Sequence, residues 1–323
     1  MKETDIRPAD LLGKYLELSL QDGLAMDRAK FVRVPCPACL GERTASKLEK
    51  NGFAFVQCSN CGSVFCSPRP TQEALDKLYE EAPSSEFWAR VFFPAVAETR
   101  REKLFAKKAR EIGKLIAPRP EDGGLGICDV GAGYGIFLEE LGKVFPRASL
   151  HAIEPGPELA AACRAKDIET LQAYAEDAQA WAGRFDLVLS SEVVEHVFSP
   201  ERFVRALFRL TKPGGATILT GLGYEGFDIL VLQQKSQSVF PPHHINFLSI
   251  QGFESLFRRV GFGQVEVWTP GELDVERVLT SGQAPEFLEV LSRRPDALQQ
   301  FQEFLRGAKL SSHVWVLARK PTT

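Results

Sequence analysis

Short apolar strands alternate with helices from Leu125 onward, and this alternation constrains the fold more than any other feature of the chain. Strand-like segments fall at 125–130, 149–153, 185–190 and 216–220, with helical segments between them at 136–144, 157–166 and 201–211. A helix at 249–260, a strand at 264–268, two or three helices and a last strand at 313–318 follow. Short apolar strands separated by helices predict an α/β fold, with a parallel sheet covered on both faces.

Composition excludes several classes of protein. With 323 residues and 44% hydrophobic residues, the chain can bury a large core, which argues against disorder. Its 39 basic and 42 acidic residues give a formal charge of -3, so nothing in the charge balance favours a nucleic-acid partner. We find neither an apolar run long enough to span a membrane nor a secretory signal at the start, and we expect a cytoplasmic protein.

Four of the seven cysteines form two CxxC pairs, Cys36 with Cys39 and Cys58 with Cys61. Eighteen residues separate the pairs, a spacing typical of a four-cysteine zinc site. Four buried free thiols are the alternative. Because thiolates would fill all four positions, the sequence predicts a closed, structural zinc ribbon without zinc chemistry. Cys66 has no paired partner and is expected only to pack.

The motifs divide the chain into four parts. We predict an N-terminal helical segment at 1–33, the zinc ribbon at 34–70, a helical linker or lid at 71–117 and the main domain at 118–323. The first helix is expected to be an appendage, and the ribbon has too few apolar residues for a core of its own. Thr71 is the predicted N-cap of the third part. The residues expected to end that part are Pro118, Pro120, Gly123 and Gly124.

A glycine-rich loop, Asp129–Gly135, joins the first strand of the main domain to its helix. Glycines at this place let the backbone approach a ligand closely at the carboxyl edge of a sheet. Residue 136 is Ile, so the pattern is GxGxG and not the GxGxxG of dinucleotide-binding proteins, which argues against NAD. Glu154 ends the next strand, where its carboxylate could accept both hydroxyls of a ribose; a solvated charge is the alternative.

These motifs resemble the class I S-adenosylmethionine-dependent methyltransferases, in particular the branch similar to the ubiquinone-biosynthesis O-methyltransferases. Asp129–Gly135 resembles the first motif of the family and Glu154 its ribose-binding acid. Phe185–Val197 is similar to the fourth strand with its EVLEH-type continuation, and Leu210–Gly215 to the loop before the fifth strand. The resemblance covers about residues 111–267.

The resemblance implies a Rossmann-like, mostly parallel seven-stranded sheet, S-adenosylmethionine as cofactor and a small-molecule acceptor. Many relatives have an acidic residue that contacts adenine where this chain has Tyr174, so we expect backbone contacts and stacking there. A ribbon, a Pro68–Thr71 segment and this core together resemble bacterial methyltransferases of surface-sugar and secondary-metabolite pathways, which suggests a nucleotide-linked sugar or similar metabolite as acceptor. The residues expected at the cofactor are Asp129, Gly131, Ala132, Gly133, Tyr134, Glu154, Pro155, Tyr174, Ala175, Ser191 and Glu192.

Three of the five histidines are candidates for the general base of methyl transfer. His196 follows the fourth strand, and His243 and His244 lie in a proline-containing loop after the fifth, which we expect to form a rigid lid. Imidazole titrates near neutrality, which suits a base. A buried or capping histidine is the alternative for His196.

Other polar residues are open to two interpretations. We place Glu192 at the crevice and Glu195, on the same short helix, in a capping or solvent-exposed position. Tyr224 and Glu225 line the acceptor pocket or belong to an exposed loop.

The pairs Arg100-Arg101 and Lys107-Lys108 form a solvated helix face or hold a phosphate-bearing substrate. Rival functions are methylation of RNA or protein with the ribbon as the reader, and binding of S-adenosylmethionine without catalysis. The sequence leaves the acceptor, its reacting atom and the oligomeric state open.

Overall fold

The computed structural model describes residues 3–116 and 124–322, and its centre is a seven-stranded sheet in the order β10-β11-β8-β7-β4-β5-β6. The strands are β4 Gly126–Val130, β5 Ser149–Ile153, β6 Glu169–Leu171, β7 Phe185–Ser191, β8 Thr211–Leu222, β10 Gln264–Trp268 and β11 His313–Arg319. The neighbouring strands in the run β8-β7-β4-β5-β6 pair in parallel, whereas β11 runs antiparallel to β8 and β10. The predicted mostly parallel α/β sheet is therefore confirmed.

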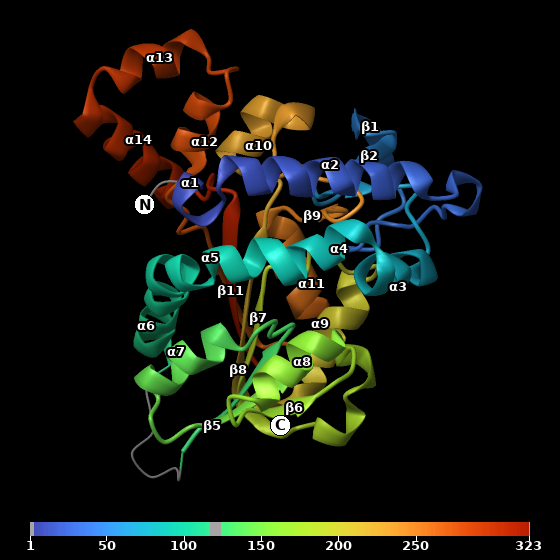
Figure 1. Cartoon of the computed structure of the whole chain (residues 1–323), viewed down its shortest axis with the longest axis vertical. Coiled ribbons are helices and arrows are strands. Elements are labelled where there is room, and N and C mark those ends of the chain that lie inside the picture. Colours follow the sequence, from blue (N-terminus) through green and yellow to red (C-terminus); the bar gives the residue numbers. More distant parts are fainter. Residues whose placement is uncertain (1–2, 117–123, 323) are drawn as a thin grey trace.

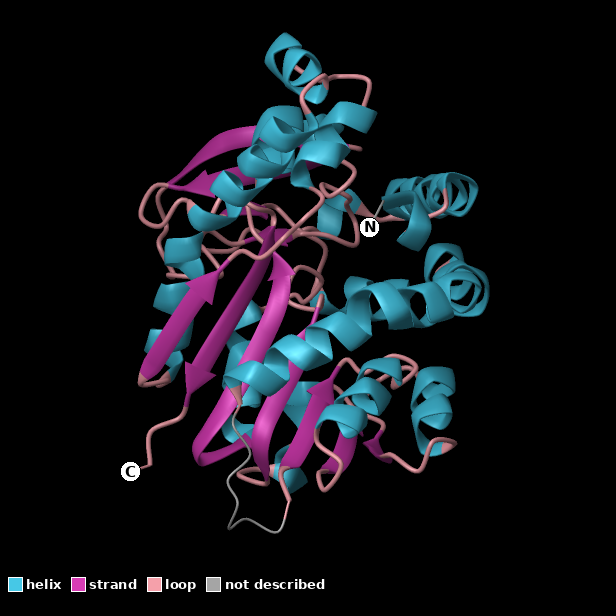
Figure 2. Cartoon of the chain, turned by 90° about the vertical axis from the view of Figure 1, so that its left-hand side faces the viewer, coloured by secondary structure: helices cyan, strands magenta, loops and turns pink. Residues whose placement is uncertain are grey.

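Helices cover both faces of this sheet, as Figure 2 shows. Apolar residues of α9 (Pro200–Leu210) and α11 (Ile250–Val260) form one core cluster, and those of α6 (Ala106–Leu115) and α7 (Ile136–Val144) form another. The hydroxyls of Ser199 and Ser249 cap α9 and α11 by accepting a backbone N–H of the first turn, which satisfies a donor that the helix leaves free. α8 (Pro157–Arg164) follows β5 and packs on β5 and β6.

Two details of the sheet differ from the sequence prediction. β8 begins at Thr211 and not at Ala216, because residues 212–215 form a bulge between the pairs Phe185–Thr211 and Leu187–Ala216. The short edge strand β6 was not predicted, since three residues carry too little periodicity. Two 3-10 turns follow it at Ala175–Asp177 and Gln179–Trp181.

The ribbon forms a second sheet of strands β1 (Thr44–Lys50), β2 (Phe53–Cys58), β3 (Val64–Cys66) and β9 (Asn246–Phe247), all paired antiparallel. β9 is distant in sequence from the other three strands and directly follows the predicted histidine loop. Buried side chains of β2, β3 and β9 share one apolar cluster with α3 (Gln72–Glu81). The ribbon thus completes its core with residues from outside it.

The N-terminal segment is not an appendage. It folds into α1 (Glu3–Ile6), α2 (Ala9–Ala25) and a 3-10 turn at Arg28–Lys30, where one helix was expected. Tyr15 of α2 is buried against Phe92, Val96 and Phe240, so α2 packs on the rest of the chain. Figure 1 shows α2 crossing above the helices of the linker.

The linker is helical from residue 72 to 115 except at Ala82, and Thr71 caps it as predicted, its hydroxyl accepting the N–H of Ala74. After α3 come α4 (Pro83–Phe87), a π-helical turn at Trp88–Phe92, α5 (Phe93–Arg100), a second π-helical turn at Arg101–Phe105, and α6. The predicted stop signals Pro118, Pro120 and Gly123, and the boundary between 117 and 118, lie outside the described residues.

Further helices lie at the end of the molecule next to α1 (Figure 1). They are α10 (Phe227–Leu232) with a 3-10 turn at Gln233–Lys235, and the insertion between β10 and β11, which holds α12 (Asp274–Thr280), α13 (Glu286–Ser292) and α14 (Pro295–Gly307). Their apolar residues form a separate cluster. The described residues include no helix with the length and apolar character needed to cross a bilayer.

Candidate active site

A cavity of about 1360 Å³ lies at the carboxyl ends of the parallel strands. The linker helices and α2 line its opposite side, through residues such as Tyr15, Trp88 and Phe93. All of the residues predicted for the cofactor and for catalysis line it, although they come from separate loops. They are Asp129, Gly131, Ala132, Gly133, Tyr134, Glu154, Pro155, Tyr174, Ala175, Ser191, Glu192, His196, His243 and His244.

The glycine loop presents backbone to this cavity. Gly131, Gly133 and Gly135 have φ values of 78°, 55° and 71°, in the left-handed region that favours glycine. A Cβ at Gly131 would lie 2.6 Å from Val193, whereas a Cβ at Gly133 would meet no atom within 4 Å. Gly133 is therefore the point at which the loop faces open space.

Glu154 ties the end of β5 to this loop. Its Oε2 accepts the N–H of Gly133 at 2.8 Å, and its Oε1 accepts the N–H of Gly156 at 3.0 Å. Burial raises the pKa of Glu154, and these two hydrogen bonds oppose the rise. Each carboxylate oxygen has a second lone pair that a ligand hydroxyl could occupy.

Asp129 is 2% exposed, and its Oδ1 has no hydrogen-bond partner among the described residues. Burial raises the pKa of Asp129 to about 7, with Lys108 opposing the rise. Buried polar groups are normally hydrogen-bonded, so an unpaired carboxylate oxygen at a cavity wall points to a ligand that donates there.

Tyr174 and Ala175 form the cavity wall next to Glu154, on the loop after β6. Burial raises the pKa of Tyr174, which leaves it a neutral phenol. Glu176 and Asp177 also reach the lining, so acidic side chains are present near the position where Tyr174 departs from the family pattern.

Glu192 stands at the end of β7 with a φ of 55°, uncommon for a residue with a side chain. Its Oε1 accepts the hydroxyl of Thr220 at 2.8 Å and lies 3.6 Å from Lys108 Nζ and 3.5 Å from His313 Nδ1. Burial disfavours the charge, but His313, Lys108 and Thr220 outweigh burial and hold the pKa of Glu192 at about 2. His313 was not among the predicted site residues, because a lone histidine in a strand carries no signal.

Glu195 contradicts its predicted capping or solvent-exposed position. Residues 192–196 form a turn and not a short helix, and Glu195 is 1% exposed. Its Oε2 has no partner among the described residues, and burial raises the pKa of Glu195 well above its ordinary value. Burial therefore favours the protonated form of this carboxyl at the cavity wall.

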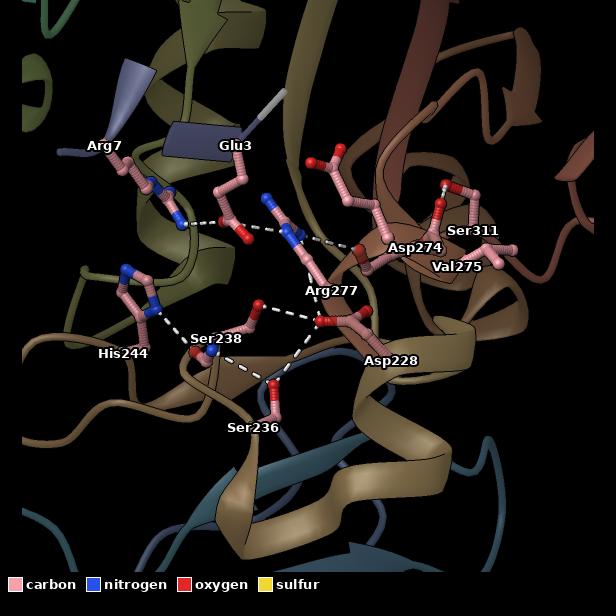
Figure 3. A network of polar contacts seen from close by, with 12 residues as sticks. Glu3, Arg7, Asp228, Ser236, Ser238, His244, Asp274, Val275, Arg277 and Ser311 are labelled. Carbon is pink, nitrogen blue, oxygen red and sulfur yellow. Dashed lines mark hydrogen bonds and ion pairs between the residues drawn. The ribbon is translucent and has the colours of Figure 1, made fainter. Parts of the chain in front are cut away.

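The three candidate histidines lie together, and each has a local partner. His243 Nε2 lies 2.9 Å from Ser84 Oγ, His196 Nδ1 lies 3.1 Å from the carbonyl oxygen of His243 and 3.1 Å from the hydroxyl of Tyr79, and His244 Nδ1 lies 2.8 Å from the carbonyl oxygen of Ser238. Figure 3 shows the His244 contact.

Burial lowers the pKa of all three imidazoles, to about 4 for His196 and about 3 for His243. They are neutral at physiological pH. The loop of His243 is not an outer lid, since Phe240 and His243 are buried against Tyr15 of α2. The sequence carried no signal for Tyr79 and Ser84, which come from the linker.

The two basic pairs of the linker do not form a solvated face. Arg101 bonds to acidic residues of α7, whereas the other three line the cavity, Lys107 in an ion pair with Glu272. Lys108 donates to Thr220 at 2.9 Å. Arg100 lies against the rings of Trp88 and Phe93, at 5.4 and 5.6 Å.

The Nε and Nη1 atoms of Arg100 are buried without a hydrogen-bond partner among the described residues. Burial and the nearby Arg7 lower the pKa of Arg100 to about 10, so the guanidinium remains charged at neutral pH. A charge that is removed from water without a partner is costly. Its place on the cavity wall therefore indicates an anionic group on a ligand.

Tyr224 and Glu225 do not line the cavity. Tyr224 is 6% exposed in the apolar cluster of the ribbon, and Glu225 accepts the N–H of Ile250 at the start of α11. The prediction that these residues line the acceptor pocket is therefore wrong. The alternative of an exposed loop is also wrong for Tyr224.

An ion-pair network joins α1 to α10 and α12 (Figure 3). Glu3 of α1 accepts from Arg7 at 3.3 Å and from Arg277 of α12 at 3.0 Å, and Arg277 lies 3.8 Å from Asp228. Asp274 accepts the N–H of Ser312 at 2.7 Å. These contacts hold α1 against the helical insertion.

The four cysteines of the CxxC pairs meet at one point, with all sulfur atoms within 4.8 Å of one another. Cys36 and Cys61 are 3.5 Å apart and Cys39 and Cys58 are 3.6 Å apart. A tetrahedral zinc ion with bonds of about 2.3 Å places its sulfur ligands about 3.8 Å apart, which these distances approach. The donor set fits zinc.

Comparisons with known proteins agree with this geometry. A family model described as "Methyltransferase domain" matches residues 96–267, more than half of the chain. The chain is 36% identical over 169 residues to the ubiquinone biosynthesis O-methyltransferase of Caulobacter vibrioides, covering 48% of this chain and 66% of that protein. It is 33% identical over 116 residues to the one of Xanthomonas axonopodis pv. citri, covering 34% of this chain and 48% of that protein.

The matched stretch thus spans between about half and just under two thirds of these relatives. A SAM-dependent methyltransferase structure from Archaeoglobus fulgidus has a TM-score of 0.50 at 17% identity, covering 71% of this chain and 100% of that chain, and so shares the fold. The family match, the sheet and the glycine loop at its edge lead to one conclusion: the chain belongs to the S-adenosylmethionine-dependent methyltransferase domain family.

Proposed function

We propose that this chain transfers the methyl group of S-adenosylmethionine to a small-molecule acceptor. One observation carries the proposal: the glycine loop and the histidines line the same cavity. At about 1360 Å³ this cavity exceeds the roughly 300–1,000 Å³ of ordinary ligand pockets, which leaves room for cofactor and acceptor together.

On the cofactor side, each polar group has a counterpart in S-adenosylmethionine, which supplies an activated methyl group on its sulfonium. Glu154 would accept the ribose hydroxyls, and the unpaired Oδ1 of Asp129 would accept the ammonium group. The unpartnered guanidinium of Arg100 would bind the carboxylate. Tyr174 and Ala175 would contact adenine. The predicted residues Gly131, Ala132, Gly133, Tyr134, Pro155 and Ser191 would shape the same half of the cavity, whereas Glu192, at the end of β7, would stand where this half meets the acceptor half.

On the acceptor side, His196, His243 and His244 offer neutral imidazoles that can position an acceptor or take its proton. Their apolar surroundings, with Tyr15 and Phe240 against His243, suit a small molecule that is partly apolar. A nucleotide-linked sugar or a similar metabolite remains our proposed acceptor class. Since the relatives are ubiquinone biosynthesis O-methyltransferases, an acceptor of that biosynthesis is the second class to test.

The ribbon is proposed to bind a structural zinc ion through Cys36, Cys39, Cys58 and Cys61. Among the described residues, none from 34 to 70 lines the cavity, which supports a structural role over recognition of RNA or protein. The ribbon instead fixes β9, since Cys66 donates its N–H to the carbonyl of Ile245, next to His244. A thiolate site of this kind also supports a reducing compartment, the cytoplasm.

The test is an incubation of the purified protein with S-adenosylmethionine labelled on its methyl group and an extract of the source cells. Label in the small-molecule fraction is the expected result. Label in RNA or protein would instead favour methylation of those macromolecules. Binding of the cofactor without any transfer would favour a non-catalytic binding protein. A Gly131→Val variant serves as the control, because its side chain would collide with Val193 and distort the loop.

A further inference from the structure

Glu192 and His313 meet at the acceptor half of the cavity. In the sheet order β11-β8-β7-β4-β5, the glycine loop follows β4 and Glu154 ends β5, whereas His313 begins β11 on the opposite side of β7. His313 Nδ1 lies 3.5 Å from Glu192 Oε1, and both residues line the cavity. The sheet itself therefore places this pair beyond the cofactor loop.

The carboxylate of Glu192 is held rigidly. Thr220 of β8 donates to it at 2.8 Å, and Lys108 of α6 lies 3.6 Å away while itself donating to Thr220. The backbone of Glu192 is in the left-handed region, with a φ of 55°. Such a conformation costs energy in a residue with a side chain, and it persists at functional sites where surrounding contacts impose it.

His313 differs from the other histidines of the cavity. His196 and His244 have Nδ1 on backbone carbonyls and His243 has Nε2 on a serine hydroxyl. Within the described ranges, His313 alone of these four has a carboxylate at ion-pair distance, and no hydrogen bond occupies its Nε2. A histidine whose Nδ1 faces a carboxylate and whose Nε2 is available is the arrangement of a general base in a catalytic dyad.

We propose that His313, oriented by Glu192, is the general base that takes the proton from a hydroxyl group of the acceptor. This inference rests on the proposed function and names its chemistry as O-methylation. The acceptor oxygen forms its bond to the methyl carbon as the carbon–sulfur bond breaks. The hydroxyl proton passes to Nε2 of His313, Glu192 stabilises the resulting imidazolium, and S-adenosylhomocysteine leaves.

The charges around His313 agree with this role. Besides Glu192 it faces Asp274, which favours the imidazolium, and Lys108 and Arg277, which disfavour it. Burial is the largest influence, and together these groups lower the pKa of His313 below its ordinary value. The imidazole is therefore neutral at physiological pH and able to accept a proton.

The test compares His313→Gln and His313→Ala with the wild type. Affinity for S-adenosylhomocysteine is measured by calorimetry, and methyl transfer is measured with the acceptor fraction obtained from the cell extract. We expect unchanged affinity for S-adenosylhomocysteine, kcat reduced at least about 100-fold with a similar KM, and partial recovery of His313→Ala by free imidazole. His151→Gln is the matched control, because His151 lies outside the cavity, near Glu169.

The outcomes separate the two proposals. No transfer by the wild type would reject the proposed function itself. Transfer by the wild type together with equal transfer by His313→Gln would overturn the role of His313. A raised KM with unchanged kcat, or a loss that imidazole does not relieve, would make His313 a binding or structural residue. A methyl group found on nitrogen or carbon would overturn the hydroxyl acceptor.

Discussion

Replacing Gly133 by alanine should remove cofactor binding while leaving the fold intact. Gly133 has a φ of 55°, and a Cβ added there would meet no protein atom within 4 Å. Its N–H, which donates to Glu154, is retained. The free protein should therefore lose only the left-handed strain of a non-glycine residue, about 1–2 kcal/mol. The added methyl group would project into the space proposed for S-adenosylmethionine.

Gly183→Ala is the matched control for this strain. Gly183 has a φ of 64°, a Cβ there would also meet nothing within 4 Å, and the residue is outside the cavity lining. Both variants should lose a similar free energy of unfolding. A loss of about 1 kcal/mol lowers Tm by roughly 2–4 °C in domains of 150–250 residues. Only Gly133→Ala should lower the affinity for S-adenosylhomocysteine. The expected loss is at least about tenfold, which is about 1.4 kcal/mol.

Calorimetric titration gives the affinity, and thermal unfolding with and without S-adenosylhomocysteine gives the stability. Ligand at about 100 times Kd stabilises a native protein by about 2.7 kcal/mol, so wild type and Gly183→Ala should both show a clear shift. Wild-type affinity in Gly133→Ala would refute the placement of the cofactor at this loop. A much larger loss of stability in Gly133→Ala than in Gly183→Ala would refute the claim that its Cβ points into open space.

Three further predictions follow from buried polar groups. Arg100→Gln should weaken the binding of S-adenosylhomocysteine at least about tenfold. The same calorimetric assay should show unchanged binding of methylthioadenosine, which has no carboxylate. Equal effects on the two ligands would contradict the assigned contact. Asp129 has a pKa raised from 3.8 to about 7, so its contribution to the unfolding free energy of the ligand-free protein should fall as pH rises through this window. Asp129→Asn removes this contribution, so the stability of the variant measured in denaturant titrations should fall less, or rise more, with pH than that of the wild type, and an unchanged pH profile would argue against the raised pKa. Cys58→Ser should lower the zinc content measured by mass spectrometry and lower Tm, whereas retention of stoichiometric zinc would exclude Cys58 as a ligand.

Much of the fold follows from local patterns. The predicted strands and helices of the main domain lie within a few residues of the observed ones, because apolar periodicity and capping residues act over one or two turns. The glycine loop and the two CxxC pairs are local as well, since the spacing along the chain fixes which groups are adjacent. In the structure the glycine loop lines the cavity, and the four cysteine sulfur atoms lie together.

The wrong prediction for the basic pairs of the linker has a structural cause. The pairs Arg100-Arg101 and Lys107-Lys108 were expected either to form a solvated helix face or to hold a phosphate-bearing substrate. In the structure Arg101 bonds to α7, whereas Arg100 and both lysines line the cavity. Two π-helical turns, at Trp88–Phe92 and Arg101–Phe105, interrupt the α-helix here. A π-turn holds more residues than an α-turn, so it shifts which side chains face the core, and a 3.6-residue period misassigns them.

The sequence by itself determined the α/β class, the cofactor loop and the cysteine cluster, because each depends on residues close together in the chain. Only the tertiary structure decided which distant groups meet: Glu192 with His313, Ser84 with His243, and β9 with the ribbon. It also buried Glu195 and brought α2 over the cavity. These contacts depend on how the sheet, the linker and the ribbon pack, and no local spacing encodes that packing.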